Sequence, residues 1–403
     1  MAGPLHGVVV LDMSRVLAGP WSGQLLADLG AQVIKIERPQ GGDDTRGWGP
    51  PWLEETLAGE GVREAAYYLC ANRGKASVTL DISHPEGQAL VRELARQADI
   101  LIENFKVGGL ARYGLDYASL AALNPRLIGC SITGFGQDGP YAHRAGYDFM
   151  IQAMGGLMSV TGEPDGQPMK TGVAITDVMT GLYATVGILA ALNERERTGR
   201  GRQIDVSLLD VQVATLANQS LNALVSGASP ERHGNAHPNI VPYEAFPCVD
   251  GYLVLTVGND GQFARLARRL GQPEWASDPA YATNAARVAH RHQLVPMIAT
   301  LLRRRRRDEW LADFEADGIP AGPINTVGEV FDDPQVRHRG LAFHFERDGT
   351  RIPQVANPLR FDREPQLSDR PPPRLGEDTA RVLGERLGLD EERLAALRER
   401  GVI

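Results

Sequence analysis

The chain has few cysteines, three among 403 residues, and Cys70, Cys130 and Cys248 lie far apart. This spacing excludes a disulfide framework and the paired ligands of a zinc site, and it is typical of core residues in a reducing compartment. No window reaches the roughly 18 apolar residues of a membrane-spanning helix, and the first residues lack the basic and apolar regions of a signal peptide. We therefore expect a cytoplasmic protein that does not bind a membrane.

An excess of positive charge is also absent, since the net charge is −8. The field of such a protein repels nucleic acid, and an anionic ligand must be held by local basic groups. The run Arg303–Arg307 has no interleaved aromatic residues and is expected to be a solvated helix face. We therefore expect no nucleic acid partner. His233 and His237 lack the further ligands that a metal site needs, so we expect no bound metal either.

A dinucleotide-binding loop is missing, although the chain opens with a β-α-β pattern. The strand 7–12 (GVVVLD), the helix 22–30 (SGQLLADLG) and the strand 32–37 (QVIKIE) form this unit. The loop between the first strand and the helix contains Gly19 alone, where close approach to a pyrophosphate needs the pattern GxGxxG. A bound dinucleotide cofactor is therefore not expected.

The order of the predicted elements indicates the fold class. Strands and helices alternate up to about residue 140, which predicts a parallel, doubly wound α/β sheet. Beyond about residue 225 the chain becomes rich in Gly, Pro and His and then mostly helical, so we expect a second, smaller lobe. The amphipathic helix 389–403 needs a surface to pack on and is expected to return to the first lobe.

Several polar residues flank the predicted strands. Ligands of an open α/β sheet bind outside the carboxyl ends of its strands, and Arg38, Asn104 and Arg112 follow strands. Arg73 and Lys75 precede a strand, so Lys75 reaches such a site only if its loop folds over it. Each of these side chains alone is also typical of a solvated surface, but together they indicate a small anionic ligand.

Asp177 begins the apolar helix 177–194, which we expect to be buried. Thr176 is predicted to cap this helix, so Asp177 lies in the first turn, where free N–H groups stabilise negative charge. Aspartate is also common at helix starts for purely structural reasons. Because a Gly-rich segment precedes the helix, we expect Asp177 in an enclosed cleft and consider it a candidate nucleophile.

Read together, these segments resemble the class III CoA-transferase family, also known as the CaiB/BaiF type. The resemblance runs from end to end of the chain, and its motifs follow one another in the family's order. They are LDMSRVLAGP, QVIKIERP, GDDTR, NRGKASVTLD, ENFKVGGLARYGL, SITGFGQDGPY, AGYD, GVAITDVMTGLYA, GRGRQIDVSLLD, HPNIVPYEAF, GPINTVGEVFDDPQV and PPPRLGEDT.

The resemblance implies an architecture. Residues 1–200 would form the first part of a large Rossmann-like domain that binds CoA, and 201–225 would form a linker. Residues 226–328 would form an inserted smaller α+β domain, and 329–403 a return segment that completes the large domain. Two protomers would interlock as rings in a homodimer.

The resemblance also implies the site residues. Asp177 matches the catalytic aspartate of the family. Family positions that hold CoA are matched by Ala18, Arg38, Asn72, Lys75, Asn104 and Arg112. An acyl-CoA and a small carboxylic acid would be the substrates, without a prosthetic group, through an aspartyl anhydride and an aspartyl-CoA thioester.

Within the family the chain is most similar to enzymes that transfer CoA from succinyl-CoA to dicarboxylates such as glutarate. It departs from other members at Arg15, where a histidine occurs, at Leu17, where a glutamine occurs, and at Asp378, where a histidine is usual. A Gly-only loop that covers the site of formyl-CoA transferase has no counterpart, which argues against formyl or oxalyl transfer.

Two alternatives stay open at this point. The α-methylacyl-CoA racemases share the fold, but they use a histidine at the position of Tyr147, and a tyrosine is a poor proton shuttle near neutral pH. A CoA-binding protein without turnover is the other alternative, and the presence of Asp177 argues against it.

Overall fold

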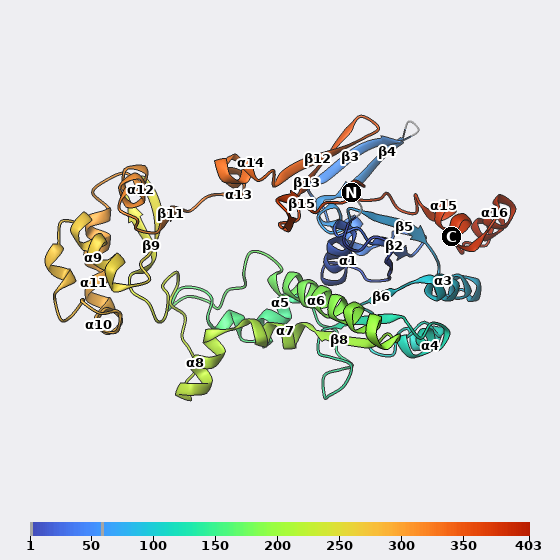
Figure 1. Cartoon of the computed structure of the whole chain (residues 1–403), viewed down its shortest axis with the longest axis horizontal. Helices are drawn as coiled ribbons and strands as arrows, with labels where there is room; N and C mark the ends of the chain where they lie inside the picture. Colours follow the sequence, from blue (N-terminus) through green and yellow to red (C-terminus); the bar gives the residue numbers. More distant parts are fainter. Residues whose placement is uncertain (1–2, 58–59) are drawn as a thin grey trace. The chain divides into compact units, whose positions relative to one another are not determined.

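The computed structural model describes residues 3–57 and 60–403, and these form two compact units (Figure 1). The large unit comprises the residues up to Leu157, Thr171–Leu221 and Pro334–Ile403. The small unit comprises Met158–Lys170 and Asn222–Asp333.

A six-stranded parallel sheet forms the centre of the large unit, in the order β5-β2-β1-β6-β7-β8. Strands such as Ile100–Glu103, which begins with three apolar residues, are buried along their whole length, as strands covered on both faces must be. The order reverses between β1 and β6, as in doubly wound folds, which confirms the predicted parallel α/β class. The strands are β1 (Val9–Asp12), β2 (Gln32–Glu37), β5 (Lys75–Thr79), β6 (Ile100–Glu103), β7 (Ile128–Thr133) and β8 (Gln203–Ser207).

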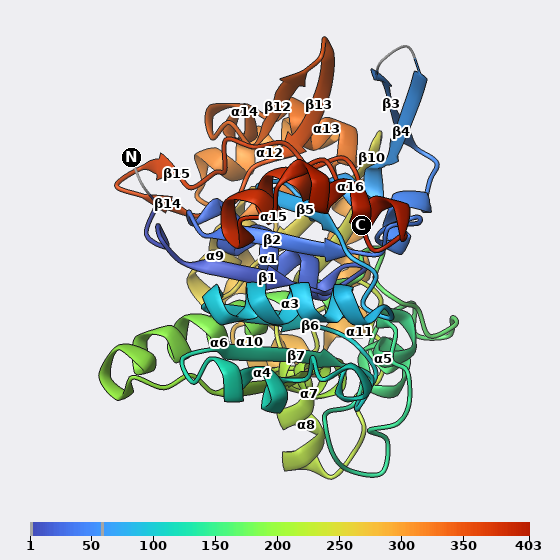
Figure 2. The ribbon, with the colours of Figure 1, turned by 90° about the vertical axis from the view of Figure 1, so that its right-hand side faces the viewer.

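Helices cover both faces of this sheet (Figures 1 and 2). One apolar core joins it to α3 (Pro85–Gln97), α4 (Tyr117–Leu123), α15 (Thr379–Leu387) and α16 (Glu391–Glu399). A second core joins its other face to α1 (Ala18–Asp28), α5 (Asp148–Met154), α6 (Ile175–Thr198) and α7 (Leu208–Thr215). The sheet is therefore enclosed on both sides by apolar side chains.

Helices α1 and α6 run side by side in the same direction. A Cβ on Gly181 of α6 would lie 2.6 Å from the carbonyl oxygen of Ala18, so only glycine permits this approach. One turn further on, the hydroxyls of Ser22 and Thr185 are 2.9 Å apart. Because α1 follows the carboxyl end of β1, this parallel packing brings the amino ends of both helices to the carboxyl edge of the sheet.

Helix α6 is less buried than its apolar sequence predicts. Its residues Ala184, Ile188 and Ala191 belong to the core, but Val186 is 64% exposed and Tyr183 is 46% exposed. The prediction of a buried helix is thus wrong for one face, because the sheet and its helices reach only the other face. By length and composition alone α6 could also cross a membrane, and in this structure it packs on α1, α7, β7 and β8.

The C-terminal segment packs against the first half of the chain. Val382, Leu383 and Leu394 share a core with Val78 and Leu80 of the β5 region. Asp378 accepts a hydrogen bond of 3.1 Å from the backbone N–H of Ser77, and it forms ion pairs with Arg370 and Arg381. Asp378, at a position where the family usually has histidine, thus binds the C-terminal segment to β5, the edge strand of the sheet.

The sequence did not predict the hairpin that precedes β5. Strands β3 (Trp52–Leu57) and β4 (Glu60–Ala65) pair as this hairpin, and the short helix α2 (Ala66–Leu69) follows it. Residues 201–225, which the resemblance assigns to a linker, contain the edge strand β8, which pairs with β7, and helix α7.

The small unit contains a three-stranded antiparallel sheet of β9 (Tyr243–Cys248), β10 (Gly251–Thr256) and β11 (Ala321–Pro323). Its core includes side chains of α9 (Asp260–Arg269), α11 (Arg291–Leu302) and α12 (Arg307–Ala316). The small unit also contains α10 (Asn284–Ala289) and α13 (Val327–Asp332), and α8 (Asn218–Ser226) includes the boundary between the two units. The remaining helix and strands, α14 (Pro334–His338), β12 (Ala342–Arg347), β13 (Thr350–Val355), β14 (Arg360–Phe361) and β15 (Glu364–Pro365), belong to the large unit.

Candidate active site

The loops that follow β1 and β6 meet where the strand order of the sheet reverses. Asn104 accepts a hydrogen bond of 3.0 Å from the backbone N–H of Arg15 and donates one of 2.8 Å to its carbonyl oxygen. In open α/β sheets this switch point is where ligands bind. Asn104 therefore joins the loops after β1 and β6 at the place where a ligand is expected to bind.

Two arginines stand on this edge with a single carboxylate between them. Arg15 pairs with Asp44 at 2.6 Å and Arg38 pairs with the same carboxylate at 2.8 Å. The side chain of Arg38 is 56% exposed and that of Arg15 is 46% exposed. Two cations against one anion leave net positive charge in contact with solvent, which suits a phosphate group.

Arg112 stands apart from this pair. Its guanidinium lies 4.5 Å from the ring centroid of the neighbouring Tyr113, and its side chain is exposed. Arg112 follows β6, as the sequence predicts, and is free to turn toward a ligand at the carboxyl edge. Arg73, in contrast, is buried in an ion pair of 2.6 Å with Asp28.

Lys75 and Asn72 lie inside the protein, below this edge. The Nζ of Lys75 donates three hydrogen bonds of 2.9 Å, to Asp12 Oδ2, to the carbonyl oxygen of Pro20 and to Asn72 Oδ1. Asn72 donates in turn to the carbonyl oxygen of Tyr68 at 2.8 Å. Both side chains are completely buried, so in this structure they support the first turn of α1 and offer no free group to a ligand.

This corrects the expectation that the loop before β5 carries Lys75 over the site. Lys75 is the first residue of β5, and its side chain runs beneath α1, where a Cβ on Gly23 would lie 3.2 Å from its Nζ. Removal from water lowers the pKa of Lys75 to about 8, although the Asp12 carboxylate acts in the opposite direction.

A second buried pair fixes the loop after β1. The Nζ of Lys35 donates to Asp43 Oδ2 at 2.9 Å and to the carbonyl oxygen of Ser14 at 2.9 Å. Burial alone would raise the pKa of Asp43, but Lys35 and the hydrogen bonds from Thr45 lower it to about 2. The same carboxylate accepts from the N–H of Val16, whose φ of 72° is strained for a β-branched residue. The loop before α1 is therefore held rigidly from below.

Ala18 is the first residue of α1, and it is buried. The helix has no side-chain cap at its N-terminus, and its residues Ala18 and Trp21 lie against Gly181 in the second turn of α6. Because Gly181 is one turn after Asp177, Ala18 and Asp177 lie on neighbouring first turns.

Asp177 is the third residue of α6, which confirms its predicted place in the first turn. The predicted cap is wrong, because the helix begins at Ile175 and Thr176 is already inside it. The Thr176 hydroxyl instead donates to Gln212 Oε1 at 2.6 Å. The N–H groups of Thr176 and Asp177 are bound by the carboxylate of Asp148, at 2.8 and 3.2 Å.

The carboxyl group of Asp177 is half-buried and has an unusual acidity. Removal from water raises its pKa to about 7, and the negative charge of Asp148 adds to the effect. A carboxyl group with such a pKa is half ionised near neutral pH and more basic than an ordinary aspartate, as a nucleophile or proton carrier needs to be.

Aromatic side chains that the sequence analysis missed accompany Asp177. Burial raises the pKa of the Tyr67 phenol to about 12, and the charge of Asp177 is the next cause, so the two groups are electrostatic neighbours. The ring of Trp48 meets that of Tyr67 edge to face, with 5.3 Å between centroids. These residues flank the unpredicted hairpin, and the motif YYLCANRGK was the only sequence signal near them.

Tyr147 precedes α5 as its N-cap residue, and its side chain is 64% exposed. It occupies the position at which the racemases have histidine.

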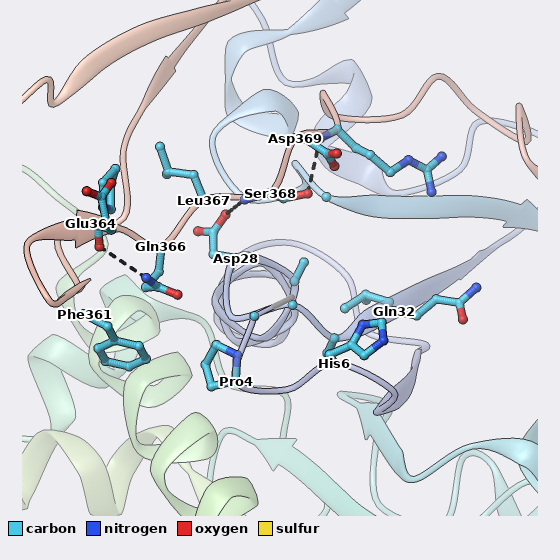
Figure 3. A pocket seen from close by; sticks show the side chains of 18 of the residues that line it. Pro4, His6, Asp28, Gln32, Phe361, Glu364, Gln366, Leu367, Ser368 and Asp369 are labelled. Carbon is cyan, nitrogen blue, oxygen red and sulfur yellow. Dashed lines mark hydrogen bonds between the residues drawn. The ribbon is translucent and has the colours of Figure 1, made fainter. Parts of the chain in front are cut away.

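A cavity of about 1060 Å³ lies at the opposite edge of the sheet (Figure 3). Its lining includes Val33 near the start of β2 and Gly74 just before β5, which places it at the amino ends of the strands. None of the predicted site residues lines this cavity, so we do not assign the chemistry to it.

Comparison with known proteins identifies the family of the chain. Residues 5–379 match the model of a family described as CoA-transferase family III. A protein of Agrobacterium fabrum named succinate--glutarate CoA-transferase is 56% identical over 383 residues, which cover 95% of each chain. The human succinyl-CoA:glutarate CoA-transferase is 42% identical over 401 residues, which cover 99% of this chain and 90% of the human protein.

Solved structures show the same fold. The crystal structure of a CaiB/BaiF family protein from Brucella suis matches with a TM-score of 0.84 and 51% identity, over 96% of this chain and 100% of the other. The Rv3272 protein of M. tuberculosis matches with a TM-score of 0.82 and 31% identity, over 94% of this chain and 99% of the other.

Proposed function

The chain belongs to CoA-transferase family III, as its motifs predict, and we propose that this enzyme transfers CoA from succinyl-CoA to a free dicarboxylate such as glutarate, with Asp177 as the nucleophile. The observation that carries this proposal is the half-buried Asp177 carboxyl group in the first turn of α6, with a pKa raised to about 7. The names of the two glutarate-active relatives support the choice of substrates.

The transfer needs one carboxylate that can be acylated and released again. An oxygen of Asp177 attacks the thioester carbonyl carbon of the donor, the C–S bond breaks, and CoA leaves as a thiolate. The thiolate then attacks the aspartyl carbonyl of the resulting anhydride, which releases succinate and leaves an aspartyl-CoA thioester. The acceptor carboxylate repeats these steps in reverse, so the energy of the thioester is conserved.

The environment of Asp177 suits both halves of this reaction. A desolvated carboxylate is more nucleophilic than a hydrated one, and the anhydride and thioester last longer where water is excluded. The Tyr67 ring, with Trp48 against it, would supply apolar surface beside Asp177, and the first turn of α1, which packs on the second turn of α6, would supply backbone N–H groups. Such N–H groups would stabilise the oxyanion of each tetrahedral intermediate.

The nucleotide part of CoA would bind at the switch point of the sheet. Arg38 and Arg15 offer exposed cations, Asn104 joins the two loops beneath them, and Arg112 is free to approach from the loop after β6. Ala18 would let the ligand approach the first turn of α1. Asn72 and Lys75 would act from below, by holding that turn and the neighbouring loops in place.

Further parts of the proposal extend the family resemblance. We propose that the small unit acts as an inserted domain, that two chains interlock as a homodimer, and that the enzyme works in the cytoplasm without a prosthetic group.

A panel of acceptor acids with succinyl-CoA as donor tests the proposed substrates. Dicarboxylates of four to six carbons, glutarate among them, are expected to accept CoA at least about tenfold better, in kcat/KM, than formate, oxalate or carnitine. Oxalate or formate as the best acceptor would refute this specificity. Equilibrium exchange of labelled succinate into succinyl-CoA separates a transferase from a protein that only binds CoA.

A further inference from the structure

Asp148, the first residue of α5, is bound to the first turn of α6 through its carboxylate. Its Oδ1 accepts hydrogen bonds from the N–H groups of Thr176 at 2.8 Å and of Asp177 at 3.2 Å. Its Oδ2 accepts one of 2.6 Å from the amide of Gln152, one turn further along α5. One side chain therefore holds the backbone of the nucleophile, although it lies 29 residues earlier in the sequence.

The partners of this carboxylate are themselves fixed. Gln152 is completely buried, and its Oε1 accepts a hydrogen bond of 3.0 Å from the N–H of Thr171, in the segment that leads into α6. From the other side, Gln212 of α7 accepts the Thr176 hydroxyl at 2.6 Å. The position of Asp177 is thus set by α5 and α7 together.

The bonds to Asp148 also change the electrostatics at Asp177. A helix N-terminus ordinarily stabilises a carboxylate in its first turn through free N–H groups. In α6 two of these N–H groups donate hydrogen bonds to the carboxylate of Asp148. This carboxylate also places a negative charge beside Asp177. Tyr67 of α2 is a further titratable neighbour of Asp177. Trp21 of α1 and Gln212 of α7, which contact the first two turns of α6, carry no charge.

We propose that Asp148 is a positioning residue of the transfer reaction, which fixes the first turn of α6 and raises the free energy of the Asp177 carboxylate through its own charge. This rests on the proposed role of Asp177 as the nucleophile. When Asp177 forms the bond to the thioester carbonyl, its negative charge leaves with the CoA thiolate as the C–S bond breaks. Repulsion from Asp148 is then relieved, so the charge of Asp148 favours acylation over the resting state.

The variant Asp148→Asn tests this, because the amide keeps an oxygen for the two N–H groups and removes the charge. We expect the acidic limb of kcat/KM for succinyl-CoA, recorded between about pH 5.5 and pH 9, to move to lower pH by on the order of one unit. On the alkaline plateau kcat should fall about tenfold, since the nucleophile is less basic, while KM for succinyl-CoA changes less than about twofold.

Thr176→Val is the matched control. It removes the hydroxyl bond to Gln212 and keeps both N–H groups and the Asp148 charge. Its thermal stability should fall while its acidic limb stays at the wild-type pH. Titration of the substrate acids is the same for all variants, so only a difference between variants reports on Asp177.

An unmoved limb in Asp148→Asn, or an equal shift in Thr176→Val, overturns the role of Asp148. If Asp148→Asn does not fold, Asp148→Ser offers a neutral acceptor at the same place, and the same shift is expected and the same outcomes overturn the proposal. Trapping of the acyl group on Asp177 in the wild-type enzyme separates the two proposals. If the acyl group is trapped on Asp177 and the acidic limb of Asp148→Asn does not move, only the proposed role of Asp148 is refuted. If the acyl group is trapped on another residue, the proposal that Asp177 is the nucleophile is refuted.

Discussion

Nζ of Lys75 donates a hydrogen bond of 2.9 Å to Oδ2 of Asp12, and both side chains are completely buried beneath the first turn of α1. Burial would raise the pKa of Asp12, but Lys75 and Lys35 outweigh it, and the pKa is lowered from its usual value. A charge pair of this kind is costly to break, because the remaining charge stays buried without a partner.

Lys75→Ala should therefore destabilise the fold before it affects ligand binding. We expect a loss of about 3–5 kcal/mol in the free energy of unfolding by urea, with part of the protein unfolded at assay temperature. The exposed Lys106→Ala serves as the control and should change stability by less than about 0.5 kcal/mol. A stable Lys75→Ala enzyme with only a raised KM for succinyl-CoA would mean that Lys75 reaches the ligand directly.

Arg38→Ala should behave in the opposite way, because this side chain is exposed and shares Asp44 with Arg15. The loss of one phosphate contact far from the reacting carbon is expected to raise KM for succinyl-CoA about 5- to 30-fold with kcat nearly unchanged, and with wild-type stability. Arg96→Ala, which removes an exposed arginine of α3, is the control. A collapse of kcat at unchanged KM would place Arg38 at the reacting end of the substrate.

The close approach of α1 and α6 predicts a third result. A Cβ on Gly181 would lie 2.6 Å from the carbonyl oxygen of Ala18, so Gly181→Ala must move the two first turns apart. We expect kcat to fall by about two orders of magnitude, since small displacements at a reacting group are costly. Gly187→Ala, whose Cβ would meet only the side chain of Ile204, with Cγ2 at 3.2 Å, should retain most of the activity. Equal activity of the two variants would show that this contact does not position the site.

Much of this arrangement could be predicted from the sequence, and the failures have physical causes. Apolar runs and their spacing identify the parallel sheet, and an apolar helix beginning at Asp177 places this residue in a first turn. Burial is harder to predict, because it depends on neighbours far away in the chain. Lys75 was therefore expected on a loop that folds over the site, and the helix that contains Val186 was expected to be buried, whereas Lys75 is completely buried and Val186 is exposed.

Contacts across long stretches of sequence escape prediction for a similar reason. Asp148 caps α6 from 29 residues upstream, and no periodicity connects the two positions. Its motif drew attention to Tyr147 instead, whose side chain is exposed to water. Thr176 was expected to cap the helix because threonine often does so, but the helix starts one residue before it.

The raised pKa of Asp177 predicts a pH-dependent change in stability. With a pKa of about 7 in the folded protein and 3.8 as the reference value, the folded state binds more protons between these values, so stability falls as the pH rises through them. Asp177→Asn removes this penalty and should stabilise the protein at pH 8 by on the order of 1–3 kcal/mol. The gain should shrink toward pH 5 in denaturation experiments. A variant less stable than wild type at both values would contradict the raised pKa.

Covalent capture at Asp177 tests the central claim most directly. Wild-type enzyme is incubated with succinyl-CoA and then with hydroxylamine, which attacks an anhydride or thioester carbonyl but not a free carboxylate. We expect a hydroxamate mass shift confined to the peptide that contains Asp177, and we expect none in Asp177→Asn, whose exchange activity should fall by several orders of magnitude. Modification of another residue, or full activity of Asp177→Asn, would contradict the proposed mechanism.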